Sequence, residues 1–162
     1  MNIFMVDKDP VISAKMLHNR HVCKMVIELA QLLSTAHAIL DNNGLQVSGL
    51  YKPTHKNHPS AKWVREADEN YIWAYDHFVG LCDEYTFRYG KTYLTESKMK
   101  YLLGNLPNNI LINKLTEMPQ CMPDEYKVPG DPVQGYRNYY NAKKVEGNSW
   151  KNREVPDWVI IP

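Results

Sequence analysis

The strongest pattern of hydrophobic and polar positions lies between residues 9 and 36. From His21 onward the sequence predicts a long helix, because apolar residues recur at helical spacing and polar residues fall on one row, three and four residues apart. The apolar face contains Val22, Met25, Val26, Leu29, Leu33 and Ala36. The polar row contains His21, Lys24, Glu28, Gln31 and Thr35. A helix that is apolar around most of its circumference is typical of a protein core, so we expect this helix to organise the fold.

The polar row needs an explanation, because burying such groups without partners is costly. One interpretation is a structural ion pair between Lys24 and Glu28, which are four residues apart. Another is that the row lines a cleft in which chemistry takes place. Surface exposure, with oligomer contacts covering the apolar faces, is a third. We expect the row to line one pocket together with side chains from residues 52–58.

Start and stop signals place the long helices. Asp9 is a helix N-cap residue, and the helical stretch that follows it is interrupted near Asn19. The turn residues at 41–44 predict its end. Residues 60–89 keep helical spacing and predict a second long helix, for which Gly90 is the natural C-cap.

Shorter patterns predict how the ends of the chain are held. Residues 2–6 are apolar and predict a single strand or an extended segment in the core. This would carry the N-terminus towards the body of the protein, so we expect the Met1 amine and Glu28 to lie close together. Near the other end, Trp150 and Trp158 are expected to pin the tail onto the core.

The predicted fold class is mainly α, with a single domain over residues 1–162. Residues 1–104 form a helical core, in which Thr95 caps a short final helix. Residues 105–131 contain four prolines and are expected to be irregular. Residues 132–162 form a C-terminal helix and tail.

Composition narrows the classes of function. The chain has 162 residues and a net charge of +1, so a nucleic-acid partner would have to meet a local basic patch. The three cysteines form no CxxC pair, which is typical of free thiols in a reducing compartment. No run of eighteen apolar residues predicts a membrane span, and no signal-peptide pattern is present. We therefore expect a cytoplasmic protein, or one of the host cytoplasm if a phage encodes it.

A loop before the second long helix is dense in polar groups. Pro59 sits naturally at a first helical position, and backbone N–H groups at such a helix start favour anions. The loop is either solvated or contacts phosphate or substrate. The candidate contacts are Lys52, Thr54, His55, Lys56, Asn57 and His58. Aromatic residues of the following helix either pack in the core or stack on a base.

Local basic patches are the expected DNA contacts. One lies around the start of the second long helix and contains Lys52, Lys56, Lys62 and Arg65. Another lies on the last helix and contains Arg137, Lys143 and Lys144. Binding through such contacts is expected to weaken as salt rises.

The sequence predicts neither a metal nor a cofactor. Two HxxH pairs, His18 with His21 and His55 with His58, lack a convincing third ligand. No P-loop, dinucleotide-binding fingerprint or nucleophile-elbow motif is present.

Three segments carry a resemblance to a known family: SAKMLHNRHVCKMVIELAQLL, NHPSAKW and GLCDEYTFRYGK. They resemble the pyrimidine-dimer DNA glycosylase (endonuclease V) family, and are nearer its uncharacterised phage and bacterial relatives. The resemblance covers about residues 1–95. The shared positions correspond here to Leu17, His21, Lys24, Glu28, His58, Pro59 and Trp63.

The resemblance implies a set of catalytic groups. In the characterised glycosylases the nucleophile is the N-terminal α-amine, exposed by loss of Met before a Thr, and a glutamate of the first long helix assists it. Asn2 is larger than that Thr and predicts that Met1 is retained, so the amine is that of Met1. Glu28 is the corresponding glutamate, and His21 is a further catalytic candidate.

The same resemblance suggests which residues bind the substrate. Arg20 and Lys24 flank Glu28 and would hold phosphates, while His55 or His58 would move a proton near neutral pH. Gln31 and Trp63 complete the substrate-binding candidates.

The function implied is a DNA N-glycosylase, with or without lyase activity, that acts on a damaged or modified base in DNA. α-Amines are partly neutral near pH 7 and attack sugar C1′ to form an imine. Two alternatives stay open. One is a non-catalytic module that binds nucleic acid or nucleotides, and the other is an N-glycosidase that acts on free nucleotides.

Overall fold

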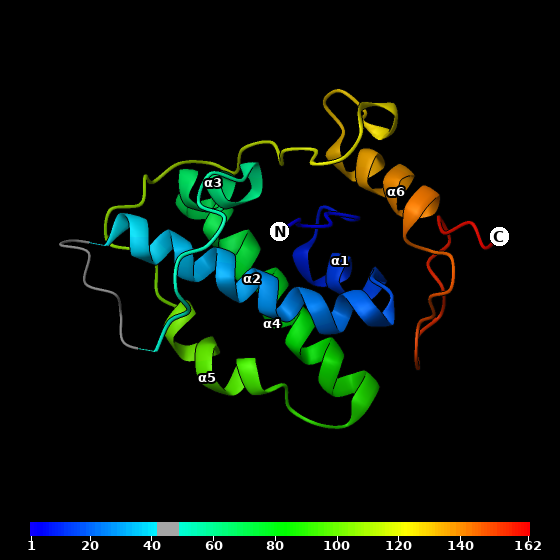
Figure 1. Ribbon diagram of the computed structural model, residues 1–162, viewed down its shortest axis with the longest axis horizontal. Coiled ribbons are helices and arrows are strands. Elements are labelled where there is room, and N and C mark those ends of the chain that lie inside the picture. Colours follow the sequence, from blue (N-terminus) through cyan, green and yellow to red (C-terminus); the bar gives the residue numbers. More distant parts are fainter. Residues whose placement is uncertain (42–48) are drawn as a thin grey trace.

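The computed structural model describes residues 1–41 and 49–162, and within them it contains six α-helices, one 3-10 turn and no strand (Figure 1). The elements are α1 (Pro10–Met16), α2 (Asn19–Leu40), α3 (Pro59–Glu66), α4 (Asp68–Tyr89), α5 (Leu94–Leu103), η2 (Asp124–Tyr126) and α6 (Pro132–Lys143). The predicted class, a mainly α single domain with two long packed helices, is confirmed.

The two long helices form the centre of the fold. α2 packs against α3, α4 and α5, and α1 packs against α4. By length and composition α2 could cross a membrane. Its apolar side chains, including Leu29 and Leu33, are instead buried among the other helices. The core position accounts for the apolarity of this helix.

Both predicted helical stretches are divided. The first is interrupted as expected, because Leu17 is extended and His18 begins α2 as its N-cap, with Nδ1 accepting the His21 N–H. The second was predicted as one helix, and this is wrong. Ala67 is extended, at φ −149° and ψ 152°, and separates α3 from α4.

Residues from the proline-rich segment explain the second break. The Asp68 N–H donates to Leu111 O instead of to a carbonyl of α3, and the Asn70 side chain donates to Trp63 O. These hydrogen bonds take the place of the backbone bonds that would continue a helix through Ala67. The apolar spacing of the sequence does not reveal them. Gly90, by contrast, is the C-cap of α4 as predicted, at φ 68°.

Two other element boundaries differ from expectation or fall outside the described chain. α5 begins at Leu94 after Tyr93, and Thr95 lies inside it with its hydroxyl 3.1 Å from that of Tyr51, so Thr95 is not the cap. α2 ends at Leu40, but the turn predicted at 41–44 extends into residues outside those described.

The N-terminal segment is extended and buried. Ile3 and Val6 are fully buried, and Phe4 is 5% exposed. Ser13 of α1 accepts from the Val6 N–H and donates to Phe4 O. Arg137 of α6 donates to Val6 O. The segment is therefore fixed from both sides, without a strand partner.

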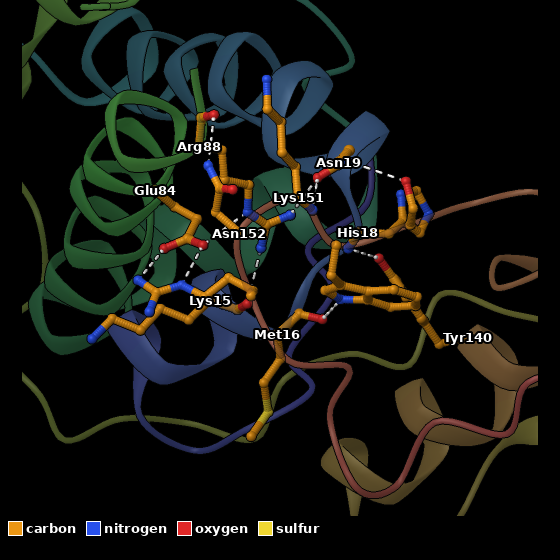
Figure 2. Close-up of polar contacts among 12 residues, drawn as sticks. Lys15, Met16, His18, Asn19, Glu84, Arg88, Tyr140, Lys151 and Asn152 are labelled. Atoms are coloured by element: carbon orange, nitrogen blue, oxygen red, sulfur yellow. Dashed lines mark hydrogen bonds and ion pairs between the residues drawn. The ribbon is translucent and has the colours of Figure 1, made fainter. Parts of the chain in front are cut away.

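The C-terminal tail closes over the junction of α1 and α2, as Figure 2 shows. The Asn19 N–H donates to Ser149 O, and Asn19 Oδ1 accepts from Lys151 N and from Arg88. Trp150 is 6% exposed and its indole N–H donates to Met16 O.

Trp158 completes the attachment of the tail. Its ring packs edge-on against Tyr140, and its indole N–H lies 3.4 Å from Met16 Sδ. Both tryptophans thus pin the tail, as predicted.

Candidate functional site

The N-terminus and α2 bring an amine and a carboxylate together. The Met1 α-nitrogen lies 3.7 Å from Glu28 Oε2, and Lys24 Nζ lies 3.3 Å from Glu28 Oε1. The Met1 side chain is only 6% exposed and that of Glu28 15%, whereas Lys24 is 66% exposed. The carboxylate therefore sits between the amine of a residue whose side chain is buried and a solvent-facing lysine. This is the proximity that the sequence predicted for Met1 and Glu28.

His58 belongs to the same neighbourhood. It is the N-cap of α3, where its Nδ1 accepts the Ser60 N–H. Burial lowers its pKa, and the positive Met1 terminus and His55 lower it further, while Glu28 opposes the shift. Because Nδ1 is an acceptor, the neutral ring carries its proton on Nε2. His58 is thus a neutral N–H donor that is sensitive to the charge of both Met1 and Glu28.

Hydrogen bonds tie the polar loop to α2. Tyr51 N donates to Ser34 Oγ, and Thr54 N donates to Thr35 Oγ1. The Thr35 hydroxyl in turn bonds to Gln31 O and Thr54 O. Thr35, the last member of the polar row, therefore anchors the loop. The half-buried Gln31 contributes its carbonyl to this anchor.

Beyond this anchor the loop presents polar side chains to solvent. Lys52, Lys56 and Asn57 are exposed. His55 is also exposed, adopts a left-handed φ of 47°, and has its Nδ1 2.7 Å from Thr54 Oγ1. Arg65 donates to Lys56 O, which fixes the loop against α3. Lys52, Lys56 and Lys62 of the predicted basic patch are therefore exposed, whereas Arg65 is half-buried and engaged with the loop backbone.

Lys24 also lines a surface hollow of about 380 Å³. Its lining consists of Asn19, Arg20, Cys23, Lys24, Tyr89 and Tyr93. The Tyr85 ring packs against those of Tyr89 and Tyr93, and Lys151 Nζ lies 5.1 Å from the centre of the Tyr89 ring. Exposed cations beside tyrosine rings suit phosphates and bases.

Sequence reasoning missed one residue that lines this hollow, Tyr93, and the cation beside it, Lys151. Tyr93 lies just beyond α4 and outside the second long helix that the sequence predicted. Lys151 lies in the tail, which shows no periodicity.

Two predicted site residues lie elsewhere. His21 is buried, with its ring stacked on Phe4 and His18 and its Nδ1 3.1 Å from the Tyr140 hydroxyl. Burial lowers the pKa of His21 to about 3. Trp63 is 2% exposed, and its indole N–H donates to Thr116 O. Both are core residues, because their rings are satisfied within the protein.

One residue of the predicted basic face of α6, Arg137, makes its contacts within the protein. Arg137 donates to Val6 O and contacts the Asp7 carboxylate at 3.6 Å. Its guanidinium also lies 5.3 Å from the centre of the Trp158 ring. Arg137 therefore holds the N-terminal segment, while Lys143 of the same helix is exposed.

Within residues 1–41 and 49–162, no group of three or more His, Cys, Asp or Glu side chains is arranged to hold a metal ion. His18 and His21 stack with ring centres 4.1 Å apart. His18 uses its Nδ1 to cap α2.

The family model of the pyrimidine dimer DNA glycosylases matches residues 1–97. The match covers more than half of the 162 residues, and the chain belongs to this family. The matched part includes Met1, Glu28 and His58 and ends within α5, before η2 and α6. No curated protein and no solved structure gives a significant match.

Proposed function

We propose that the protein is a DNA N-glycosylase that acts on a damaged or modified base, with the α-amino group of Met1 as nucleophile. The observation that carries this proposal is the 3.7 Å separation between that nitrogen and Glu28 Oε2. Membership of the glycosylase family supports a DNA substrate.

The proposed reaction begins with the neutral amine. It attacks C1′ of the deoxyribose, a C–N bond forms as the N-glycosidic bond breaks, and the base leaves with the bonding electrons and takes up a proton. Opening of the sugar ring gives an imine between Met1 and C1′. Loss of a C2′ proton from this imine would expel the 3′ phosphate, which would constitute lyase activity.

Neighbouring groups have distinct roles in this scheme. The Glu28 carboxylate stabilises the positive charge that develops on the sugar. The neutral His58 ring carries an Nε2 proton and is suited to donate a hydrogen bond through it to the leaving base or the opened sugar oxygen, while the proton that the base takes up comes from solvent. Lys24, Arg20 and the exposed lysines of the loop hold the flanking phosphates.

Borohydride trapping tests the nucleophile. The protein is incubated with duplexes that carry a pyrimidine dimer or other modified bases, in the presence of borohydride, which reduces an imine to a stable amine. We expect a covalent protein–DNA adduct whose peptide mass places the link on Met1. A permanent N-terminal extension should abolish the adduct, whereas the same extension after Pro162 should leave it unchanged.

The alternatives give different results in the same assay. Binding to DNA without base release or adduct would favour the non-catalytic module. Release of bases from free nucleotides, with none from duplexes, would favour the N-glycosidase. An N-terminally extended protein with normal turnover would exclude the amine as nucleophile and require attack by water.

A further inference from the structure

The side chain next to the candidate nucleophile is held by hydrogen bonds at both ends. Asn2 Nδ2 donates to Cys121 O at 2.8 Å. Asn2 Oδ1 lies 2.8 Å from the Tyr136 hydroxyl and accepts the Ile3 N–H at 2.9 Å. An amide side chain offers two donors and one acceptor oxygen. Here both ends of the amide are engaged, which fixes the orientation of Asn2.

The partners of Asn2 are themselves rigid. Tyr136 is fully buried on α6, and its ring lies edge-on to Phe4 with centres 6.0 Å apart. Its hydroxyl lies 2.8 Å from Pro119 O and accepts the Cys121 N–H at 3.3 Å. Burial raises the pKa of Tyr136, so the phenol stays protonated at any pH used for an assay. Tyr136 therefore keeps its one proton, for which Asn2 Oδ1 and Pro119 O are both acceptors at 2.8 Å.

These contacts come from the part of the chain beyond the family match. Residues 119–136 follow position 97, yet they hold the residue adjacent to the Met1 amine. Only the backbone of residues 1 and 2 separates the fixed amide from the nucleophilic nitrogen. The Met1 side chain, 6% exposed, supplies a second anchor. Fixing both side chains restricts where the nitrogen can lie relative to Glu28.

We propose that Asn2 and Tyr136 are positioning residues that aim the Met1 amine at the sugar, with the backbone of Cys121 as their common partner: its carbonyl accepts from Asn2 and its N–H donates to Tyr136. This inference rests on the proposed function. A nucleophile must be held about 3–3.5 Å from the atom it attacks, and a misplacement of about 1 Å costs about 10²-fold in rate. The clamp made by Asn2, Tyr136 and Cys121 meets this need in a segment that has no strand partner.

The test compares two hydroxyl deletions on the same helix. Tyr136→Phe keeps the ring and removes the hydroxyl that contacts Asn2. Tyr139→Phe is the matched control, because Tyr139 is half-buried on α6 and its ring packs against Tyr126. We expect Tyr136→Phe to lower kcat and the trapping rate by about 10- to 100-fold with KM unchanged. Tyr139→Phe should retain both.

Substitutions at Asn2 test the same clamp from the other side. Asn2→Leu has nearly the shape of Asn but makes none of the side-chain hydrogen bonds, and Asn2→Asp keeps the acceptor for Tyr136 and Ile3. Neither residue is small, so Met1 should be retained, which intact mass verifies. We expect Asn2→Leu to match Tyr136→Phe, the double variant to be no slower than either, and Asn2→Asp to recover part of the rate.

A chemical readout separates positioning from loss of structure. Reductive methylation with a small aldehyde reports the accessibility of the Met1 amine without requiring its alignment on DNA. The methylation rate should be unchanged in Tyr136→Phe while DNA trapping falls. Equal trapping by Tyr136→Phe and wild type would overturn the clamp and leave the proposed function standing. Absence of any adduct with the wild-type protein would overturn both.

Discussion

Glu28 Oε2 lies 3.7 Å from the Met1 α-nitrogen, while the second oxygen of the same carboxylate is 3.3 Å from Lys24 Nζ. The described part of the chain contains a second lysine–glutamate pair of similar geometry, without an α-amine beside it. Glu96 and Lys100 are also four residues apart, in the reverse order, with the same 3.3 Å separation and the same 15% exposure of the glutamate. Glu96 Oε2 is buried and has no hydrogen-bond partner among the described residues. The amine is what distinguishes the Glu28 pair.

This matched pair gives the first prediction. Glu28→Gln removes the charge and keeps the shape, so kcat for base release should fall at least about 10²-fold, in the range expected for a lost acid–base or electrostatic group. DNA affinity and the unfolding midpoint should change little. Glu96→Gln should leave kcat unchanged. Wild-type turnover by Glu28→Gln, measured with the same modified duplex, would remove Glu28 from the mechanism.

DNA binding should depend on the cations around the start of α3. Lys52, Lys56 and Lys62 are exposed, and each phosphate contact contributes about 0.9 to the slope of log affinity against log salt. Changing all three to Gln should therefore lower that slope by about 2 to 3. Lys127→Gln, in the turn beyond η2, should have no effect. Fluorescence anisotropy at several salt concentrations measures the slope, and an unchanged slope in the triple variant would place the DNA elsewhere.

Much of the fold could be predicted because local signals determine it. The polar row on α2, the N-cap at Asp9 and the C-cap at Gly90 all act within a few residues of sequence. The proximity of Met1 and Glu28 could be predicted with one further inference, because an apolar segment at residues 2–6 carries the terminus into the core.

The unpredicted features depend on contacts between distant segments. Ala67 interrupts a periodic pattern because Leu111 supplies the carbonyl at that point. His21 continues the polar row, but a hydroxyl 119 positions away bonds to its ring and makes it a core residue. The tyrosine that contacts Asn2 lies 134 positions away. No spacing rule within one helix reveals such partners.

A buried ion-pair network joins α4 to the C-terminal tail. We expect substitutions that disrupt this network to cause a large loss of stability. Arg88 is 1% exposed, and its guanidinium contacts Glu84 Oε1 at 2.8 Å, Asn19 Oδ1 and Lys15 O (Figure 2). Arg153 is 31% exposed and bonds to both oxygens of Glu84.

Arg88→Met should lower the free energy of unfolding by about 3–5 kcal/mol, because Glu84 is 2% exposed and would lose its buried partner. Arg153→Gln should cost less, because the lost arginine is partly solvated and Arg88 still pairs with the carboxylate. Urea unfolding followed by tryptophan fluorescence measures both. Equal losses in the two variants would contradict the assignment of Arg88 as the principal partner.

Three of the buried histidines are held neutral mainly by their burial. Tyr140 Oη accepts the His18 N–H, so its own proton is free for His21 Nδ1. His77 Nδ1 lies 2.8 Å from Pro10 O, while its Nε2 is buried with no partner among the described residues. Burial is the main cause that lowers the pKa of His18 to about 4, of His21 to about 3 and of His77 to about 4.

These shifts predict that acid destabilises the protein well before its carboxylates are protonated. Below pH about 6.5 the unfolded chain takes up protons on these histidines while the folded protein does not, so the free energy of unfolding falls as pH drops. Each histidine contributes up to about 1.4 kcal/mol per pH unit until the pH approaches its folded pKa. His21→Phe, which keeps a ring against Phe4, should reduce the slope of the free energy of unfolding against pH by about the contribution of one histidine. His55→Gln, on the exposed loop, should leave this slope unchanged. Urea unfolding between pH 7 and pH 5 measures the slope, and a free energy that is constant over this interval would show that the buried histidines take up protons equally in the folded and the unfolded protein.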